Sequence, residues 1–542
     1  MACMVEASLE ECENVRVEDV QSLAYIPTIN QITYLKKLNL SSCNLSILPD
    51  SIGLLQELQM LNLMNNKLEK LPDSLGNLSK VTLLGLKSNK LVELPESMSG
   101  MRSLKELYLT DNQLVTLPNS FSSLTSLVKL QASFNKFESL SSAISSLPCL
   151  EMMRFACCNI ASIPENLICH EDAFPALAWV SLAGNPCCPL PSLDKVLTSV
   201  RRLSKSEIQI GASLGSGASG EVFAVDSLDP VPEGLPPVSD LAVKFFVGGS
   251  GGVSPDGRLD DEVLITTLLG SEGRGSETSP LNLRHFKEED GRGVLGNGKN
   301  GIRIGDGSDP DSAARNLVQC VLASVESGGR QMENGSEGKR IVEGLLFRRF
   351  TGVPLALKPS SAHLLRCRWA EDKPSFPSPD AAVRLTRLLA RALGHCHGYS
   401  GHDCHGFCHG DIYAHNVLAT PELSPTASFD DLDSSSDGSI LLCDFGASFP
   451  YPTLSSSGAP PSTSPSPTSS PLPSLFFWES VEVRAFGLLL KDIAERVPLL
   501  KNGSEIRAAL LDLATECVAP KVWSRPSFRK IHERVQEIEN FL

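Results

Sequence analysis

The sequence has little positive charge and no long apolar run, and its first residues lack the apolar core of a signal peptide. Lys and Arg number 48 against 63 Asp and Glu, which gives a formal net charge of −15. Nucleic-acid-binding surfaces depend on clustered positive charge, so we expect no nucleic-acid partner. A run of about 18 apolar residues, the length that a membrane-spanning helix needs, is absent from the sequence, so we expect no transmembrane segment.

The N-terminus and the cysteines both favour an intracellular, cytoplasmic protein. Residues 1–6 read Met-Ala-Cys-Met-Val-Glu and turn acidic at once, without the apolar core of a signal peptide. The 16 cysteines are scattered, which suits a reducing compartment. Cysteines and histidines between His395 and His409 could suggest zinc. No Cys-x-x-Cys pair lies there, and His409 belongs to another motif, so we do not expect a zinc site.

A repeat of the form L-x-L-x-x-N/C-x-L-x-x-L-P occupies the first third of the chain. Its Asn or Cys recurs every 23 residues, at Cys43, Asn66, Asn89, Asn112, Asn135 and Cys158, and a looser copy ends at Asn185. The pattern resembles leucine-rich repeats of the short intracellular class, which stack into a horseshoe solenoid. We expect an α/β solenoid over residues 34–200, with caps at residues 1–33 and 186–204.

Alternation within each repeat predicts which side chains face which way. Leu61 and Leu63 should point into the core and Asn62 to the concave face. The repeated Asn should hydrogen-bond the backbone of the turns, with Cys43 and Cys158 as structural replacements. The predicted concave positions are Asn39, Asn62, Gly85, Tyr108, Gln131 and Arg154. Stacked strands form a broad platform, so we predict that this face binds a protein substrate or regulator; a rigid spacer is the alternative.

A glycine-rich turn between two predicted strands follows the repeats. Residues 208–214 and 222–225 read as the strands, and Gly215-Ser-Gly-Ala-Ser-Gly220 joins them. Missing side chains let backbone N–H groups approach phosphate oxygens, so this hairpin is predicted to cover ATP. The predicted nucleotide contacts are Leu214, Gly215, Ser216, Gly217, Ala218, Ser219, Gly220, Val222, Ala242 and Lys244.

Further charged residues complete a phosphoryl-transfer pattern. Lys244 ends a Leu-Ala-Val-Lys string, and Glu262, 18 residues later, is its predicted ion-pair partner, with Asp261 as the alternative. Residues 409–416 read His-Gly-Asp-Ile-Tyr-Ala-His-Asn. In that pattern Asp411 would accept the proton of the substrate hydroxyl or orient it.

An Asp-Phe-Gly string follows at residues 444–446. Asn416 and Asp444 would hold Mg²⁺. Late landmarks are an apolar helix from Glu482 and an Arg-Pro-Ser-Phe string from Arg525. Together these motifs resemble the protein kinase family over residues 205–540.

The combination with the repeats is similar to leucine-rich-repeat-containing protein kinases of bacteria and some eukaryotic microbes. The resemblance implies an α+β two-lobed kinase-like domain after the solenoid. It implies an ATP- and Mg²⁺-dependent protein kinase, for which serine or threonine is favoured over tyrosine as the acceptor.

The pattern departs from the family at several positions. Gly410 replaces an Arg that normally binds a phosphorylated activation loop, Tyr413 replaces the Lys of serine/threonine kinases, and Glu482 replaces an Asp that anchors the catalytic loop. A Glu can make the same hydrogen bonds from one methylene further away. His-Gly-Asp also resembles small-molecule phosphotransferases. That activity, and a nucleotide-binding scaffold without turnover, are the alternative functions.

Three polar stretches are predicted to be disordered insertions. They cover residues 271–314, 420–439 and 451–474, and the last is dominated by Ser, Pro and Thr. Residues 315–318 and 341–347 are predicted strands of the small lobe, and Phe347 to Phe350 should lie near the adenine pocket.

Overall fold

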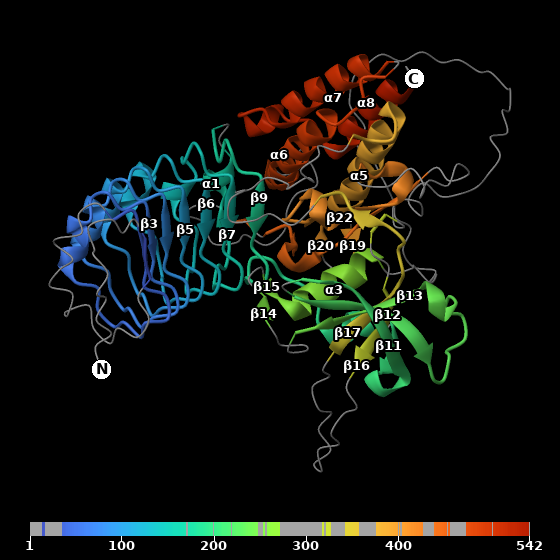
Figure 1. Cartoon of the computed structure of the whole chain (residues 1–542), viewed down its shortest axis with the longest axis horizontal. Helices are drawn as coiled ribbons and strands as arrows, with labels where there is room; N and C mark the ends of the chain where they lie inside the picture. Colours follow the sequence, from blue (N-terminus) through green and yellow to red (C-terminus); the bar gives the residue numbers. More distant parts are fainter. Residues whose placement is uncertain are drawn as a thin grey trace, which may run out of the picture.

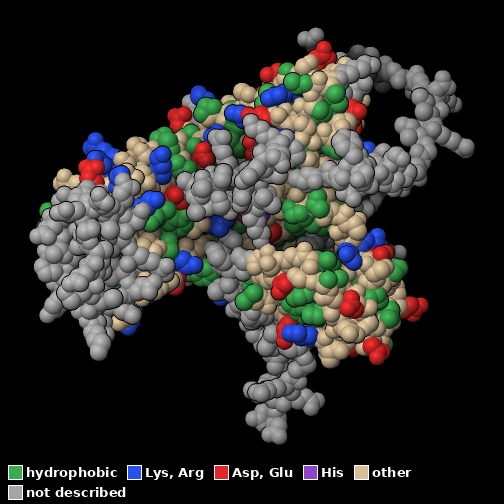
Figure 2. All heavy atoms as spheres, in the orientation of Figure 1, with side chains coloured by type: hydrophobic (Ala, Val, Ile, Leu, Met, Phe, Trp, Pro, Cys, Tyr) green, Lys and Arg blue, Asp and Glu red, His purple; other side chains and the backbone are tan. Residues whose placement is uncertain are grey.

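The computed structural model divides into a solenoid and two further lobes (Figure 1). It describes residues 14–16, 35–169, 172–198, 200–217, 219–247, 253–254, 257–270, 317–318, 321–326, 342–356, 375–398, 400–401, 404–425, 438–452, 454–455, 473–500 and 502–540. None of the described helices is long and apolar enough to cross a bilayer. On the face shown in Figure 2, the described Lys and Arg side chains are interspersed with Asp and Glu.

The solenoid is built on an eight-stranded parallel sheet. Its strands, in spatial order, are β1 (Asn14–Arg16), β2 (Lys37–Asn39), β3 (Met60–Asn62), β4 (Leu83–Gly85), β5 (Glu106–Tyr108), β6 (Lys129–Gln131), β7 (Met152–Arg154) and β9 (Trp179–Ser181). Short 3-10 turns return the chain between them, and near the end come β8 (Ile163–Pro164), α1 (Glu165–Ile168) and α2 (Leu193–Leu197). The central residue of each of strands β2 to β7 is buried, as the repeat predicts.

The predicted asparagine ladder is confirmed. Asn66 accepts from the backbone N–H of Leu45 at 2.9 Å and donates to the carbonyl of Leu40 at 2.8 Å. Asn89, Asn112, Asn135 and Asn185 repeat the pattern. The thiol of Cys158 donates instead to the carbonyl of Ala132 at 3.6 Å. Buried backbone groups in the turns are therefore satisfied from one repeat to the next.

A six-stranded sheet follows the solenoid. Its order is β10 (Arg201–Ser204), β16 (Val321–Glu326), β17 (Val342–Arg348), β13 (Leu241–Phe246), β12 (Gly220–Leu228) and β11 (Ile208–Ser216). Helix α3 (Leu259–Gly270) packs on it beside the short pair β14 (Val253–Ser254) and β15 (Gly257–Arg258).

Two predicted boundaries of this lobe differ from the structure. Residues 201–204 form an edge strand parallel to β16, with Leu203 buried, so they belong to this sheet and not to the predicted solenoid cap. Of the strand predicted at residues 315–318, only 317–318 are among the described residues, where Val318 forms an isolated bridge to Leu442. Strand β16 starts at Val321, and the strand predicted at 341–347 corresponds to β17. The strand at 201–204 lies at the edge of the sheet, where the apolar pattern of a strand is weakest.

The third lobe is mainly helical. It contains α5 (Pro379–Gly398), α6 (Pro473–Ala494), α7 (Gly503–Cys517) and α8 (Phe528–Asn540). Small sheets lie at its inner side: β18 (Val353–Pro354), β22 (Val417–Ala419) and β23 (Ile440–Leu442); β19 (Ser400–Gly401) and β20 (Cys404–His405); β21 (Phe407–Cys408) and β24 (Phe449–Pro450). Figure 1 shows these helices on one side of the small sheets and the six-stranded sheet on the other.

Two of the three predicted insertions are narrower than expected. At the ends of 420–439, two hydrogen bonds join Thr420 to Ser439, and Leu423 is buried in a 3-10 turn. At the ends of 451–474, β25 (Leu454–Ser455) pairs with β8, and α6 begins at Pro473. The rest of both stretches, and all of 271–314, lie outside the described residues. The pairing of flanking strands explains the order at these ends.

The solenoid and the helical lobe share one apolar core. Phe477 and Trp478 of α6 belong to the same buried cluster as the repeat leucines, and the Phe477 ring lies 6.1 Å from that of Phe174. Arg484 of α6 donates to the carbonyl of Ala176 at 2.9 Å. The described parts of the chain therefore pack as one unit at this junction, where β9 and α6 lie together in Figure 1.

Candidate active site

The structure brings Lys244 and Glu262 together. Lys244 on β13 forms a short ion pair with Glu262 in the first turn of α3, and their side chains are 13% and 4% exposed. Burial disfavours the charged lysine, but the carboxylates of Glu262 and Asp444 outweigh it, so the pKa of Lys244 is raised. Lys244 is therefore a fixed cation in a largely water-free position.

The alternative partner, Asp261, points elsewhere. A Cβ built on Gly184 of the solenoid would lie 3.2 Å from the Asp261 carboxylate, which places that side chain against the last repeat. Burial raises the pKa of Asp261 to about 6. Successive residues of a helix point about 100° apart, so only one of the two acids can face Lys244.

The glycine-rich hairpin lies next to this pair. Val222 pairs with Lys244 across β12 and β13, and Gly217 N–H donates to the carbonyl of Gly220 at 2.8 Å. Ser219 Oγ lies 3.5 Å from Glu262 Oε1, so the turn folds toward the ion pair. The other predicted contacts Leu214, Gly215, Ser216 and Ala242 lie on β11 and β13, while Ala218 is outside the described residues.

One glycine of this turn is required by space. A Cβ on Gly220 would lie 2.1 Å from the carbonyl oxygen of Phe245. At this position the absence of a side chain therefore serves strand packing, while the neighbouring Gly215 and Gly217 have open space around them.

Asp411, Asn416 and Asp444 come together at the inner ends of β22 and β23. Asn416 Nδ2 donates to Asp411 Oδ2 at 3.1 Å and to the Asp411 carbonyl at 2.9 Å. Cys443, next to Asp444, donates its N–H to the carbonyl of Asn416 at 3.0 Å. Asp444 adopts a left-handed φ of 64° and lies close enough to Lys244 to affect its titration.

The donor chemistry of Asn416 and Asp444 fits Mg²⁺. Mg²⁺ prefers oxygen ligands and is commonly held by one or two carboxylates together with substrate phosphates. Among the described residues, no three His, Cys, Asp or Glu side chains form a complete metal cage. Phosphate oxygens would therefore have to complete the coordination, as in phosphoryl-transfer sites.

Glu482 anchors the loop that carries Asp411, as its position in the sequence predicts. From α6 it accepts from the backbone N–H groups of His409 at 3.1 Å and Gly410 at 2.7 Å. His397 Nε2 lies 2.7 Å from the same carboxylate. Burial alone would raise the pKa of Glu482, but these hydrogen bonds and the charge on His397 lower it.

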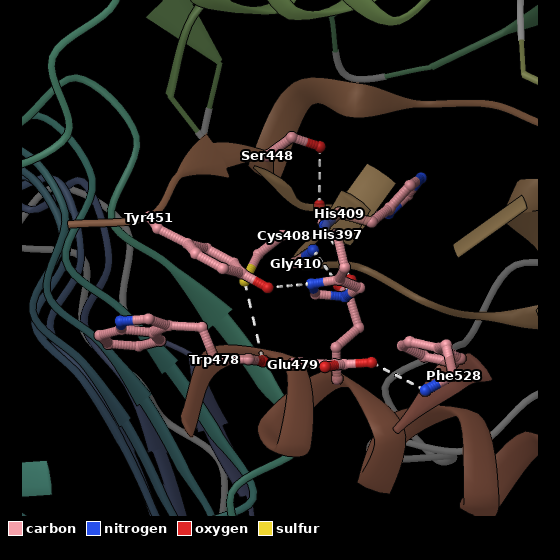
Figure 3. Close-up of polar contacts among 10 residues, drawn as sticks. His397, Cys408, His409, Gly410, Ser448, Tyr451, Trp478, Glu479 and Phe528 are labelled. Carbon is pink, nitrogen blue, oxygen red and sulfur yellow. Dashed lines mark hydrogen bonds and ion pairs between the residues drawn. The ribbon is translucent and has the colours of Figure 1, made fainter. Parts of the chain in front are cut away.

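Three supporting side chains, those of His397, Tyr451 and Ser448, could not be predicted from the sequence. Figure 3 shows a hydrogen bond between the Tyr451 hydroxyl and the ring of His397. It also shows the Ser448 hydroxyl, which donates to the carbonyl of His409 at 2.8 Å. In the sequence, His397 stands out only as a possible zinc ligand, and Tyr451 falls within a predicted insertion. Their role depends on contacts between residues 54 and 39 positions apart, which no local pattern in one sequence reveals.

The absence of an Arg at position 410 has a structural cause. Gly410 has a φ of 80°, which side-chain-bearing residues rarely adopt. A Cβ there would lie 2.6 Å from the carbonyl oxygen of Val180 and 2.7 Å from that of Ala447. Because Val180 belongs to β9, the last solenoid strand occupies the space that an Arg side chain would need.

The concave face of the last repeats contacts the same loop. Arg154 Nη2 lies 3.0 Å from Asp411 Oδ1, and the two side chains are 12% and 14% exposed. The Trp179 ring stacks on Tyr413 with centroids 4.9 Å apart, and Trp179 Nε1 donates to the carbonyl of Ile412 at 3.1 Å. The repeat pattern predicts that Arg154 faces an external partner, but in the structure it binds Asp411 of the same chain. The two residues are 257 positions apart, so the spacing of motifs in the sequence does not indicate this contact.

Comparisons with known proteins identify the repeats. Two family models described as leucine-rich repeat match residues 94–137 and residues 34–55 and 57–78. No curated protein matches significantly. The N-terminal part of the chain is therefore a leucine-rich-repeat domain, a class that typically binds proteins.

Two solved structures are similar to part of the chain. A leucine-rich-repeat protein of Leptospira interrogans has 28% identity and a TM-score of 0.29, over 33% of this chain and 50% of that one. The internalin InlF of Listeria monocytogenes has 18% identity and a TM-score of 0.27, over 31% of this chain and 46% of that one. This chain thus matches half or less of the length of either protein.

Proposed function

We propose that residues 201–540 form a protein kinase domain that transfers the γ-phosphoryl group of ATP to a protein hydroxyl, serine or threonine in preference to tyrosine. The convergence of the Lys244–Glu262 ion pair, Asp444 and the Asp411–Asn416 hydrogen bond supports the proposal. The repeats would recruit the substrate or a regulator, which raises its effective concentration at the site.

Each side chain has a defined task in this reaction. Lys244, held by Glu262, would bind the α- and β-phosphates, and Asn416 and Asp444 would hold Mg²⁺, which neutralises phosphate charge when bound. Asp411 would orient the acceptor hydroxyl and take its proton. Phosphoryl transfer needs mainly alignment and charge neutralisation, and these residues supply both.

One structural observation weakens the small-molecule alternative. Its support is the Gly of His-Gly-Asp, yet the close approach of Val180 and Ala447 explains Gly410 without reference to the acceptor. The scaffold alternative makes a distinct prediction, nucleotide binding without turnover.

Labelled ATP distinguishes these functions. Full-length protein is incubated with γ-labelled ATP and Mg²⁺, alone, with a generic protein acceptor, or with a small-molecule hydroxyl acceptor, beside Lys244→Ala, Asp411→Ala and the surface control Lys90→Ala. We expect protein-bound label that both site variants lose and the control keeps. Label only on the small acceptor would establish the second function, and nucleotide binding without label transfer the third.

A further inference from the structure

We propose that Arg154 of the solenoid is part of the phosphoryl-transfer site, where it orients Asp411 and supplies the positive charge that the catalytic loop itself lacks. The inference rests on the proposed function and extends it to a residue outside the kinase-like domain.

The loop around Asp411 contains no permanent cation. Residues 409–416 include neither Lys nor Arg, and Tyr413, two residues after Asp411, presents an aromatic ring. In phosphoryl transfer, charge spreads over the equatorial oxygens of the moving group, and a cation beside it lowers the barrier. Lys244, held by Glu262, is assigned to the α- and β-phosphates, so the acceptor side of the site needs another source of charge.

Arg154 is placed and held for this task. Its guanidinium meets Asp411 Oδ1 at 3.0 Å, while Asn416 occupies Asp411 Oδ2, so both carboxylate oxygens are oriented. An ionised carboxylate has about four acceptor sites, which leaves room for a substrate hydroxyl. The stack of Trp179 on Tyr413 holds β9, the strand beside the one that carries Arg154, against the loop of residues 409–416.

The shape of the Arg154 guanidinium also suits this task, because its planar fork can donate two parallel hydrogen bonds to phosphate oxygens. Lys129, one repeat earlier, has its pKa lowered by burial and by repulsion from Arg154, while the carboxylates of Glu106 and Asp411 oppose that shift.

The step balances without a further reactant. The acceptor oxygen forms a bond to the γ-phosphorus, the bond from that phosphorus to the β,γ-bridging oxygen breaks, and ADP leaves with that electron pair. The acceptor proton passes to Asp411. Arg154 donates hydrogen bonds and charge throughout and is unchanged at the end.

Substitution of Arg154 tests the proposal. Arg154→Met keeps the chain length without charge, Arg154→Lys keeps the charge, and exposed Arg102→Met is the matched control. Removing a transition-state donor typically costs about 10²- to 10³-fold in kcat. We expect a loss of that size for Arg154→Met with little change in KM for ATP, partial recovery for Arg154→Lys, and no change for the control.

A binding measurement separates catalysis from folding. Calorimetry compares Mg·AMP-PNP with Mg·ADP plus aluminium fluoride, which mimics the moving phosphoryl group. Arg154→Met should bind the first normally and lose about tenfold or more for the second, the equivalent of 1.4 kcal/mol.

Three results would overturn the proposal. Faster turnover in Arg154→Met would make Arg154 an inhibitory plug of the acceptor site, and unchanged turnover would make it a bystander. Weaker AMP-PNP binding together with a lower melting temperature in Arg154→Met would give Arg154 a purely structural role. If the wild-type protein itself transfers no phosphate, both the proposed function and this inference are wrong. If the wild-type protein is active and Arg154→Met is equally active, only this inference is wrong.

Discussion

At the scale of single residues, Gly410 shows how one backbone position constrains the site. Its φ is left-handed, and two carbonyl oxygens lie within 2.7 Å of the position that a Cβ would take, which leaves no room for any side chain. Gly234 has a similar φ of 82° but nothing within 4 Å of such a Cβ. A comparison of substitutions at Gly410 and Gly234 therefore separates the free-energy cost of the left-handed backbone from the cost of steric crowding around a new side chain.

We expect Gly410→Ala to destabilise the protein much more than Gly234→Ala. A left-handed non-glycine residue costs about 1–2 kcal/mol, and overpacking adds about 1–3 kcal/mol at Gly410 only. Chemical denaturation of both variants measures the difference. Equal losses of unfolding free energy in the two variants would show that the close approach of β9 to Gly410 adds no steric cost.

Asp261 predicts a pH-dependent stability. Burial raises its pKa to about 6 from 3.8, so the folded state holds the proton more tightly than the unfolded state. This contribution is fully present below the unfolded pKa and is lost as pH rises through about 6. Asp261→Asn removes the titration, so it should stabilise the protein by about 1–3 kcal/mol at pH 8 and progressively less toward pH 4.

Melting temperatures between pH 4 and pH 8 check this prediction. Asp226→Asn, on the exposed part of β12, is the control for the loss of one carboxylate at the surface. A constant difference between Asp261→Asn and wild type across that range would contradict the prediction.

At the scale of elements, α3 is held by the end of the solenoid as well as by its own lobe. Leu197 of α2 is fully buried against Leu259 and Val263 of α3, in a cluster that also includes strands of the six-stranded sheet. Because Glu262 lies on α3, the packing of α2 positions the partner of Lys244.

Loosening this contact should affect α3 locally. Leu197→Ala leaves a cavity and should cost about 2–5 kcal/mol, with faster hydrogen exchange in α3 and weaker AMP-PNP binding. Leu58→Ala, equally buried among the repeats, is the control and should not change exchange in α3. Equal α3 exchange in both variants would show that α2 does not support the helix.

Elements with a strong local pattern are the most predictable. The 23-residue register predicts the parallel sheet and its ladder, and the strand–turn–strand around Gly215 appears as β11 and β12. The partnership of Lys244 with Glu262 and of Glu482 with the loop follows from motif spacing. The Arg154–Asp411 pair and the edge strand at 201–204 do not, because each depends on a surface that exists only after distant segments have packed.

At the scale of the whole molecule, Arg525 joins three segments that are far apart in the chain. The residue is 2% exposed, and its guanidinium donates to the carbonyls of Ala519 at 2.8 Å, Ser480 at 2.9 Å and Pro175 at 3.0 Å. Pro175 belongs to the solenoid and Ser480 to α6. Burial lowers the pKa of Arg525 to about 9, which still leaves the side chain charged at neutral pH, and a charge so deeply buried needs these carbonyls as partners.

This bridge should make the solenoid and the helical lobe unfold together. Removing the Arg525 side chain leaves these buried carbonyls without a donor, and each unsatisfied group costs about 1–3 kcal/mol. We expect one calorimetric transition for the wild type and two for Arg525→Ala, because the shared core around Phe477 then loses the hydrogen bonds that span it. Arg529→Ala, whose side chain is 81% exposed, should keep a single transition. A single transition in Arg525→Ala, merely shifted to lower temperature, would mean that apolar packing alone couples the two parts.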